Sequence, residues 1–179
     1  MFIQHPLEFI PQKARSRLFY LFIGLTAAGF LIFQFLDQPL RTLAAPSGIV
    51  SFELAGSIDN AKAMMESWNQ AALLNNAFGL GFDFLFMPVY ATALSLGILL
   101  AVYRRTGFWP NIGKILGWVA YIAIGFDSIE NVALFAILHG NNVMPVPQVA
   151  FWCASIKFGI IIIGSFYGLI GWLFPERHV

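Results

Sequence analysis

Four long runs of apolar residues, separated by polar and charged segments, dominate the chain. They cover residues 18–36, 77–103, 115–138 and 149–174. The hydrocarbon core of a bilayer is about 30 Å thick and needs about 20 helical residues, because a helix satisfies its own backbone hydrogen bonds. The pattern therefore predicts an all-α, polytopic membrane protein, a bundle of four transmembrane helices that forms a single domain over residues 1–179.

The one long connection, residues 37–76, separates the first two apolar runs. Within it, apolar residues recur at helical spacing while polar residues occupy the opposite face, and Ser57 precedes them as an N-cap. The apolar positions are Ile58, Ala61, Met65, Trp68 and Ala72. We expect an amphipathic helix at the outer membrane interface, either packed over the rim of the bundle or placed as a lid over a cavity.

Basic residues are distributed unevenly between the two sides that these four spans define. Cytoplasmic segments carry the excess of Lys and Arg in membrane proteins, so we expect both termini in the cytoplasm and the 37–76 loop outside. The predicted inner segments contain Lys13, Arg15, Arg17, Arg104, Arg105, Lys114 and Arg177, whereas the outer ones contain Arg41 and Lys62.

Composition narrows the possible functions. Only 11% of the residues are charged and 59% are hydrophobic, which excludes an ordinary soluble domain. The net charge of +1 comes without a basic stripe, so nucleic acid is not an expected partner. Cys153 is the single cysteine, and His5, His139 and His178 form no pair at metal-ligand spacing, so neither a disulfide nor a zinc site is expected. No motif identifies a cofactor.

Ionisable residues inside the apolar runs are the strongest functional signal, because each costs about 2.5 to 3.5 kcal/mol to insert. Asp127, Glu130 and Asn131 stand at i, i+3 and i+4 and share one helical face. Counted from the inner boundary, Glu130 and Lys157 both lie about 22 to 24 Å deep. Asp127 lies at about 18 Å and Asp83 at about 30 Å. The polar groups therefore occupy the outer half of the predicted bundle.

Lys157 shares a helical stripe with Gly164, Gly168 and Gly171. Small residues at this spacing allow helices to approach closely, so Lys157 is expected to face protein. We predict a polar pocket with the candidate ligand-binding residues Asp83, Tyr90, Asp127, Glu130, Asn131 and Lys157. Its three acids outnumber its one ammonium, which favours binding of an amine, a metal ion, protons or a polar lipid headgroup. Alternatively, Glu130 and Lys157 form a buried ion pair and Asn131 bonds a helix backbone.

Three segments carry a resemblance: FDFLF (82–86) followed by Tyr90, DSIEN (127–131) and ASIK (154–157). They resemble segments of small four-span bacterial membrane proteins to which no activity is assigned. The similarity runs from Phe52 onward and includes FELAG (52–56). It implies the four-span fold and a bacterial inner (plasma) membrane location. A looser, architectural similarity to emopamil-binding and sigma-2 type proteins implies a pocket whose acids accept cationic or sterol-like ligands.

These observations favour an integral membrane protein that binds, or helps to transport, a small cationic or amphipathic ligand. One alternative is an intramembrane enzyme acting on a lipid or isoprenoid, with a carboxyl group as general acid or base and Lys157 or Tyr90 assisting. Another is a structural or assembly subunit of a larger membrane complex. A four-helix chain has little room for alternating access, so transport would require a homo-oligomer.

Overall fold

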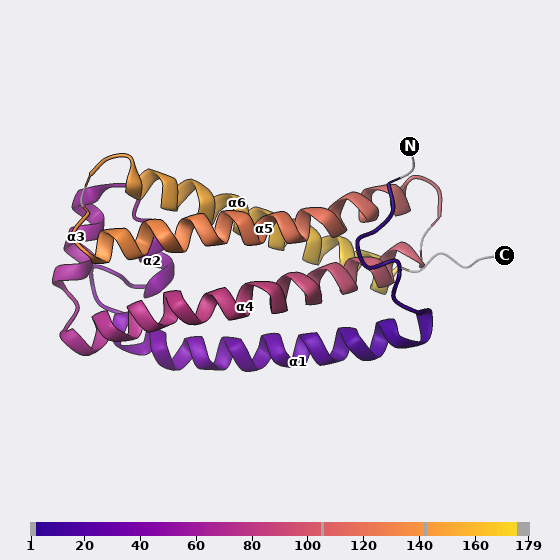
Figure 1. Cartoon of the computed structure of the whole chain (residues 1–179), viewed down its shortest axis with the longest axis horizontal. Coiled ribbons are helices and arrows are strands. Elements are labelled where there is room, and N and C mark those ends of the chain that lie inside the picture. Colours follow the sequence, from indigo (N-terminus) through magenta and orange to yellow (C-terminus); the bar gives the residue numbers. More distant parts are fainter. Residues whose placement is uncertain (1–2, 105, 142, 175–179) are drawn as a thin grey trace. The chain divides into compact units, whose positions relative to one another are not determined.

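The computed structural model describes residues 3–104, 106–141 and 143–174, and every regular element in these ranges is a helix (Figure 1). Four of the helices are long and apolar enough to cross a membrane, which confirms the predicted all-α, four-span class. Arg105, Arg177 and His178 lie outside the described residues. The elements are α1 (Gln12–Asp37), the 3-10 turn η1 (Gln38–Leu40), α2 (Ile49–Glu53), α3 (Ile58–Glu66), α4 (Gln70–Val102), α5 (Trp109–Leu138) and α6 (Val146–Leu173).

The amphipathic segment differs from its prediction. Ser57 caps α3 as expected, because its hydroxyl accepts a hydrogen bond from the Asn60 amide at 3.2 Å. The helix nevertheless ends at Glu66, so Trp68 lies in the connection and Ala72 belongs to α4. A second cap explains the break, since the Asn69 side chain accepts from the Ala72 amide at 2.9 Å and starts α4 there. The second span thus begins well before the apolar run at residue 77.

The chain forms two compact units, and every long helix contributes one stretch to each of them. The first unit comprises Met1–Ala27, Pro88–Ile124 and Phe158–Val179. The second comprises Ala28–Met87 and Gly125–Lys157. Five of the six residues predicted to form the pocket belong to the second unit.

In the first unit, the glycine stripe of α6 packs closely against α4. A Cβ atom added to Gly168 would meet the backbone of Gly97 and Ile98 at ordinary contact distances of 3.7 to 4.0 Å. A Cβ atom added to Gly171 would lie 3.0 Å from the Cα of Ala101 and closer still to its Cβ. The small residues thus face protein, as the stripe predicted.

The two glycines make a matched pair of substitutions. Gly171→Ala is expected to destabilise the tertiary fold by about 1 to 3 kcal/mol, because the new methyl group meets Ala101, which has no flexible side chain to move aside. Gly168→Ala is expected to leave stability unchanged or to raise it slightly, since alanine is the better helix former. SDS-induced unfolding in mixed micelles compares the two variants, and equal stabilities would contradict this account of the close approach.

The N-terminal segment folds back onto α5 within the first unit. Trp118 donates its indole hydrogen to the Gln4 carbonyl at 2.9 Å, and His5 is only 3% exposed. The His5 ring lies against Gly117, and its Nδ1 accepts a hydrogen bond from the Leu7 amide. Burial is the main cause that lowers the pKa of His5 to about 4, with Glu8 opposing it.

Docking of this segment is expected to weaken in acid. A lowered pKa means that the folded state binds fewer protons than the unfolded state between pH 6.5 and about 4. The stabilisation is therefore fully present above pH 6.5 and is lost as pH falls toward 4, by up to about 3 kcal/mol. Amide hydrogen exchange of residues 5–10 measures the effect. His5→Gln does not titrate, so its exchange should lack this step, and a step that persists would assign the titration to another group.

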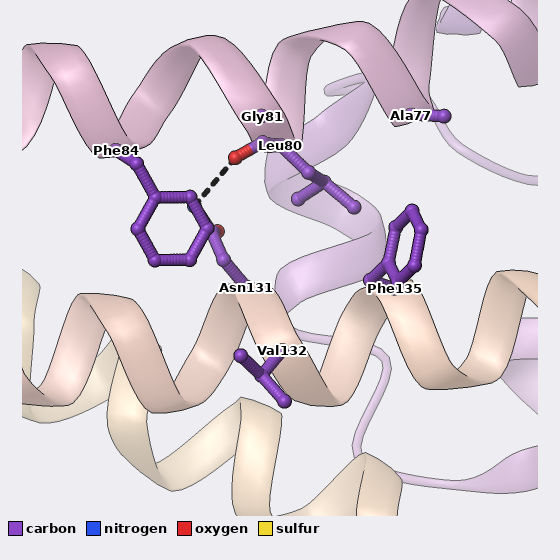
Figure 2. Close-up of a pocket in the computed structure, with 7 residues that line it drawn as sticks. All are labelled: Ala77, Leu80, Gly81, Phe84, Asn131, Val132 and Phe135. Carbon is purple, nitrogen blue, oxygen red and sulfur yellow. Dashed lines mark hydrogen bonds between the residues drawn. The ribbon is translucent and has the colours of Figure 1, made fainter.

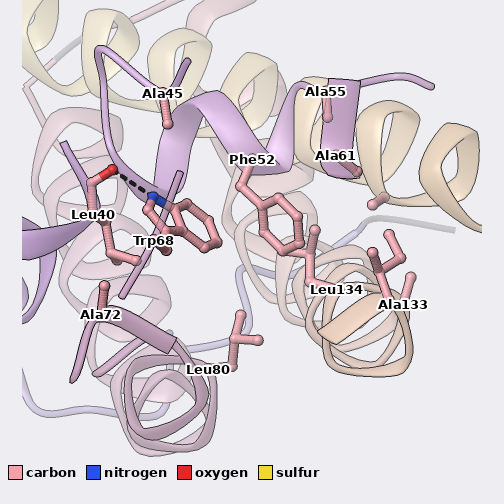
Figure 3. Packing of buried hydrophobic residues seen from close by; sticks show 12 residues of the cluster. Leu40, Ala45, Phe52, Ala55, Ala61, Trp68, Ala72, Leu80, Ala133 and Leu134 are labelled. Carbon is pink, nitrogen blue, oxygen red and sulfur yellow. Dashed lines mark hydrogen bonds between the residues drawn. The ribbon is translucent and has the colours of Figure 1, made fainter. Parts of the chain in front are cut away.

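In the second unit, the segment between α1 and α4 lies beside the beginning of α4 and the end of α5 (Figure 1). Its apolar side chains form a core with those two helices and with Ala150 of α6. Phe52 of α2 lies between Trp68 and Leu134 (Figure 3), and the Phe52 and Trp68 ring centroids are 5.1 Å apart. Trp68 also donates its indole hydrogen to the Leu40 carbonyl at 2.8 Å. These contacts hold α2 in place, and with it Glu53, the residue that follows Phe52.

The start of α2 is fastened to the end of α1. The Asp37 carboxylate accepts a hydrogen bond from the Ile49 amide at 2.6 Å and another from Arg41 at 2.9 Å. Gly48 has a φ of 58°, and a Cβ atom there would collide with the Asp37 carboxylate. Only glycine fits this position, because it combines a positive φ with close approach.

Candidate functional site

A single lysine lies among three carboxylates in the second unit. The Lys157 Nζ of α6 is 3.0 Å from Asp127 Oδ1 and 2.9 Å from Glu130 Oε2, both on α5. It is also 3.7 Å from Glu53 Oε1 at the end of α2. All four residues are buried, with Asp127 1% and Glu130 0% exposed. We refer to Glu53, Asp127, Glu130 and Lys157 as the Lys157 cluster.

Helix geometry explains how α5 supplies two of these acids. Asp127 and Glu130 are one helical turn apart, so both side chains project from the same face. Lys157 reaches that face from α6, and its contact with Glu130 agrees with the equal depths obtained by counting residues. The Glu130–Lys157 ion pair is therefore present in the structure, with Asp127 and Glu53 added to it.

Glu53 is the member of the cluster that the sequence did not point to. It lies outside the four apolar runs, in a short segment that gave no reason to place it near Lys157. The available signal was an acid between Phe52 and Leu54 in an otherwise apolar stretch. Burial raises the pKa of Glu53 above its usual range, Lys157 opposes this shift, and Asp127 adds to it.

Asn131 connects α5 to α4. Its amide nitrogen donates to the Leu80 carbonyl at 3.2 Å and to Asp83 Oδ2 at 3.0 Å. The expected bond from Asn131 to a helix backbone is thus present. Asp83 is half-buried, whereas Asn131 is 1% exposed. The Asn131 Oδ1 is buried and has no hydrogen-bond partner among the described residues.

A pocket of about 230 Å³ opens between α4 and α5 next to Asn131. Figure 2 shows the rings of Phe84 and Phe135 on either side of the hydrogen bond from Asn131 to Leu80. Phe84, Val132 and Phe135 are 46%, 62% and 46% exposed, so the walls continue onto the outer surface of the helices. The lining residues are Ala77, Leu80, Gly81, Phe84, Asn131, Val132 and Phe135.

Two further residues complete the account of the predicted pocket. Tyr90 is buried in the first unit, so it is not part of the arrangement described for the second unit, and its role stays a prediction. Asn76, which the sequence analysis did not single out, is 1% exposed, and neither its amide nitrogen nor its oxygen has a partner among the described residues. It lies one turn before Leu80 on α4, on the same helical face.

The side chains at these positions offer mainly hydrogen-bond acceptors and negative charge. Asp83, the Asn131 Oδ1 and the Lys157 cluster present more acceptors than donors. Among the described residues, no group of three or more His, Cys, Asp or Glu side chains has a geometry that could hold a metal ion.

Comparison of the chain with family models, with curated proteins and with solved structures found no match.

Proposed function

We propose that this integral membrane protein binds an amphipathic molecule with a cationic or hydroxyl-bearing head at the pocket between α4 and α5. The observation that carries the proposal is the Asn131 side chain at this pocket. Its amide is committed to Leu80 and Asp83, whereas its buried Oδ1 has no partner among the described residues. An unsatisfied buried acceptor is costly, and a donor on a ligand would satisfy it.

A charge next to the pocket supports a cationic head: Asp83 does not line the pocket, but it is bonded to Asn131, which does. Asp83 accepts a hydrogen bond from Asn131 through Oδ2, and it is only half-buried. An ammonium group donates several hydrogen bonds and carries the opposite charge, so it complements both the Asp83 carboxylate and the Asn131 oxygen. A carboxylic acid head would be repelled.

The walls of the pocket support an apolar tail. Phe84, Val132 and Phe135 are exposed on helices that are apolar enough to lie in a membrane, where they would meet acyl chains. A volume of about 230 Å³ is small compared with typical drug-sized pockets of about 300 to 1,000 Å³. It suits a head group and the first part of a chain, and the rest of the molecule would extend into the bilayer.

Photo-crosslinking with a long-chain alkylamine tests this function on the full chain in lipid nanodiscs. Labelling is expected at the α4–α5 pocket, and Val132→Trp, which fills the pocket, is expected to reduce it about ten-fold. Ile129→Trp is the matched control, because Ile129 is an exposed α5 residue that does not line the pocket. Equal labelling of both variants would overturn the proposal.

Competition with unlabelled molecules of equal chain length then tests the head group. We expect the amine to compete best, the alcohol less well and the carboxylic acid least. Asp83→Asn should weaken competition by the amine more than by the alcohol, because it removes a charge but keeps a polar group. A carboxylic acid that competes as well as the amine would contradict the assigned head chemistry.

A further inference from the structure

We propose that Glu53 and Glu130 share one proton, which makes the Lys157 cluster a proton-binding site joining α2 to α5. This site goes beyond the ligand-binding function proposed above. It uses different side chains from those that line the α4–α5 pocket, and it would stand if no amphipathic ligand bound there. Its ligand is the proton, and the chemistry that recognises it is a pair of buried carboxyl groups in contact.

The first argument is the balance of charge. One ammonium faces three carboxylates at distances of 2.9 to 3.7 Å, so full ionisation would leave two negative charges without a counterion. Glu130 and Asp127 are 0% and 1% exposed, and Lys157 is 5% exposed. An uncompensated charge at such a site costs several kcal/mol, and a carboxyl group avoids that cost by keeping its proton.

The second argument is an orphan oxygen on Glu53. Glu53 Oε2 is buried and has no hydrogen-bond partner among the described residues, whereas Glu130 Oε2 lies 2.9 Å from the Lys157 ammonium. Both carboxyl groups lie against the same ammonium, with Glu53 Oε1 3.7 Å and Glu130 Oε2 2.9 Å from Lys157 Nζ, and the two side chains interact with each other. Ionised carboxylates only accept hydrogen bonds, so two of them in contact can bond only through a proton held between them. One shared proton gives the buried Glu53 Oε2 a partner.

The third argument is the position of the lysine within the cluster. Its closest contacts are with Asp127 and Glu130, whereas Glu53 is the most distant of the three acids. Glu53 is therefore the carboxyl group that Lys157 neutralises least. Besides burial, Asp127 on α5 and Asp37 at the end of α1 raise the pKa of Glu53, whereas Lys157 and the contact with Glu130 lower it; Asp83 on α4 is a further acidic neighbour.

Loss of this proton would weaken the contact between α2 and α5. Deprotonation sends the proton to water and leaves two carboxylates in contact, which repel each other. The pKa of Glu53 is raised in the folded chain, so the shared proton stabilises the contact between α2 and α5 at low pH. This stabilisation is lost as the pH rises through the pKa of the folded state. Glu53 ends α2, so the repulsion would push α2 away from α5.

Infrared spectroscopy of the full chain in lipid nanodiscs tests the proposal, because protonated and ionised carboxyl groups absorb separately. At neutral pH the wild type is expected to show a protonated-carboxyl band that shifts in deuterium oxide and disappears in alkali. Glu53→Gln and Glu130→Gln should each remove the same band, since both residues hold the proton. Asp59→Asn, which changes an exposed acid on α3, should leave it intact.

Several outcomes would overturn the shared proton. Absence of a protonated-carboxyl band from the wild type at neutral pH would do so without any variant, even if a variant failed to fold. A band that survives both glutamine substitutions would place the proton elsewhere. A band that disappears in one variant alone would show a proton on a single carboxyl group. Amine binding at the pocket is measured separately, so failure of one proposal is distinguishable from failure of the other.

Discussion

Replacement of Lys157 by methionine is expected to destabilise the tertiary structure by about 3 to 5 kcal/mol. The substitution keeps the length of the side chain and removes its charge. Asp127 and Glu130, which lie 3.0 and 2.9 Å from the ammonium, would then be buried without a cation. Unfolding by SDS in mixed micelles measures the loss. A loss below about 1 kcal/mol would show that the ammonium does not stabilise the cluster.

A compensating variant separates loss of charge from loss of packing. Lys157→Met combined with Asp127→Asn and Glu130→Gln keeps the shape of the side chains and removes the unpaired charges. It should therefore be more stable than Lys157→Met alone. If the triple variant is as unstable as the single one, the lysine acts through packing instead.

Trp68→Ala is expected to cost about 3 to 5 kcal/mol, the range for removal of a large buried aromatic side chain. Trp68 is 6% exposed, packs edge-on against Phe52 and donates a hydrogen bond to the Leu40 carbonyl. Its removal would leave a cavity beside α2 and an unsatisfied carbonyl. Glu53 would lose the support that holds it near Lys157.

Trp152→Ala is the control for this prediction, because Trp152 belongs to the same unit but is 63% exposed. It should cost much less than Trp68→Ala. Trp68→Phe should fall between the two, since it keeps a ring against Phe52 but loses the hydrogen bond, worth about 1 to 3 kcal/mol when a buried acceptor is left unpaired. Equal losses from Trp68→Ala and Trp152→Ala would contradict the core described for α2.

Hydropathy and helical spacing were sufficient for the fold class, because both are local properties of a chain in a bilayer. The four apolar runs coincide with α1, α4, α5 and α6, although each helix begins earlier than its run. Polar flanking residues do not end a helix, whereas a cap fixes where one begins, as Asn69 does for α4. For the same reason the predicted amphipathic helix was too long. The helical spacing of its apolar residues continues past Ser67, but α3 ends at Glu66.

The candidate site was only partly visible in the sequence. Asp127, Glu130 and Asn131 share a face by their spacing alone, and residue counting placed Lys157 at the level of Glu130. The local signal for Glu53, an acid in an otherwise apolar stretch, did not place it near Lys157, because that contact depends on how the segment between α1 and α4 folds. The bond from Asn131 to Asp83 likewise joins residues far apart in the sequence.

That four helices can cross a membrane, with ionisable groups at matching depths, follows from the amino-acid order alone, because burial cost and helical repeat act on each segment separately. Which charges meet depends on how the helices pack. The Phe52 and Trp68 contacts place Glu53 at the Lys157 cluster, and the separation of α4 from α5 leaves a pocket beside Asn131. Both results depend on side chains packing across elements, which no single segment encodes.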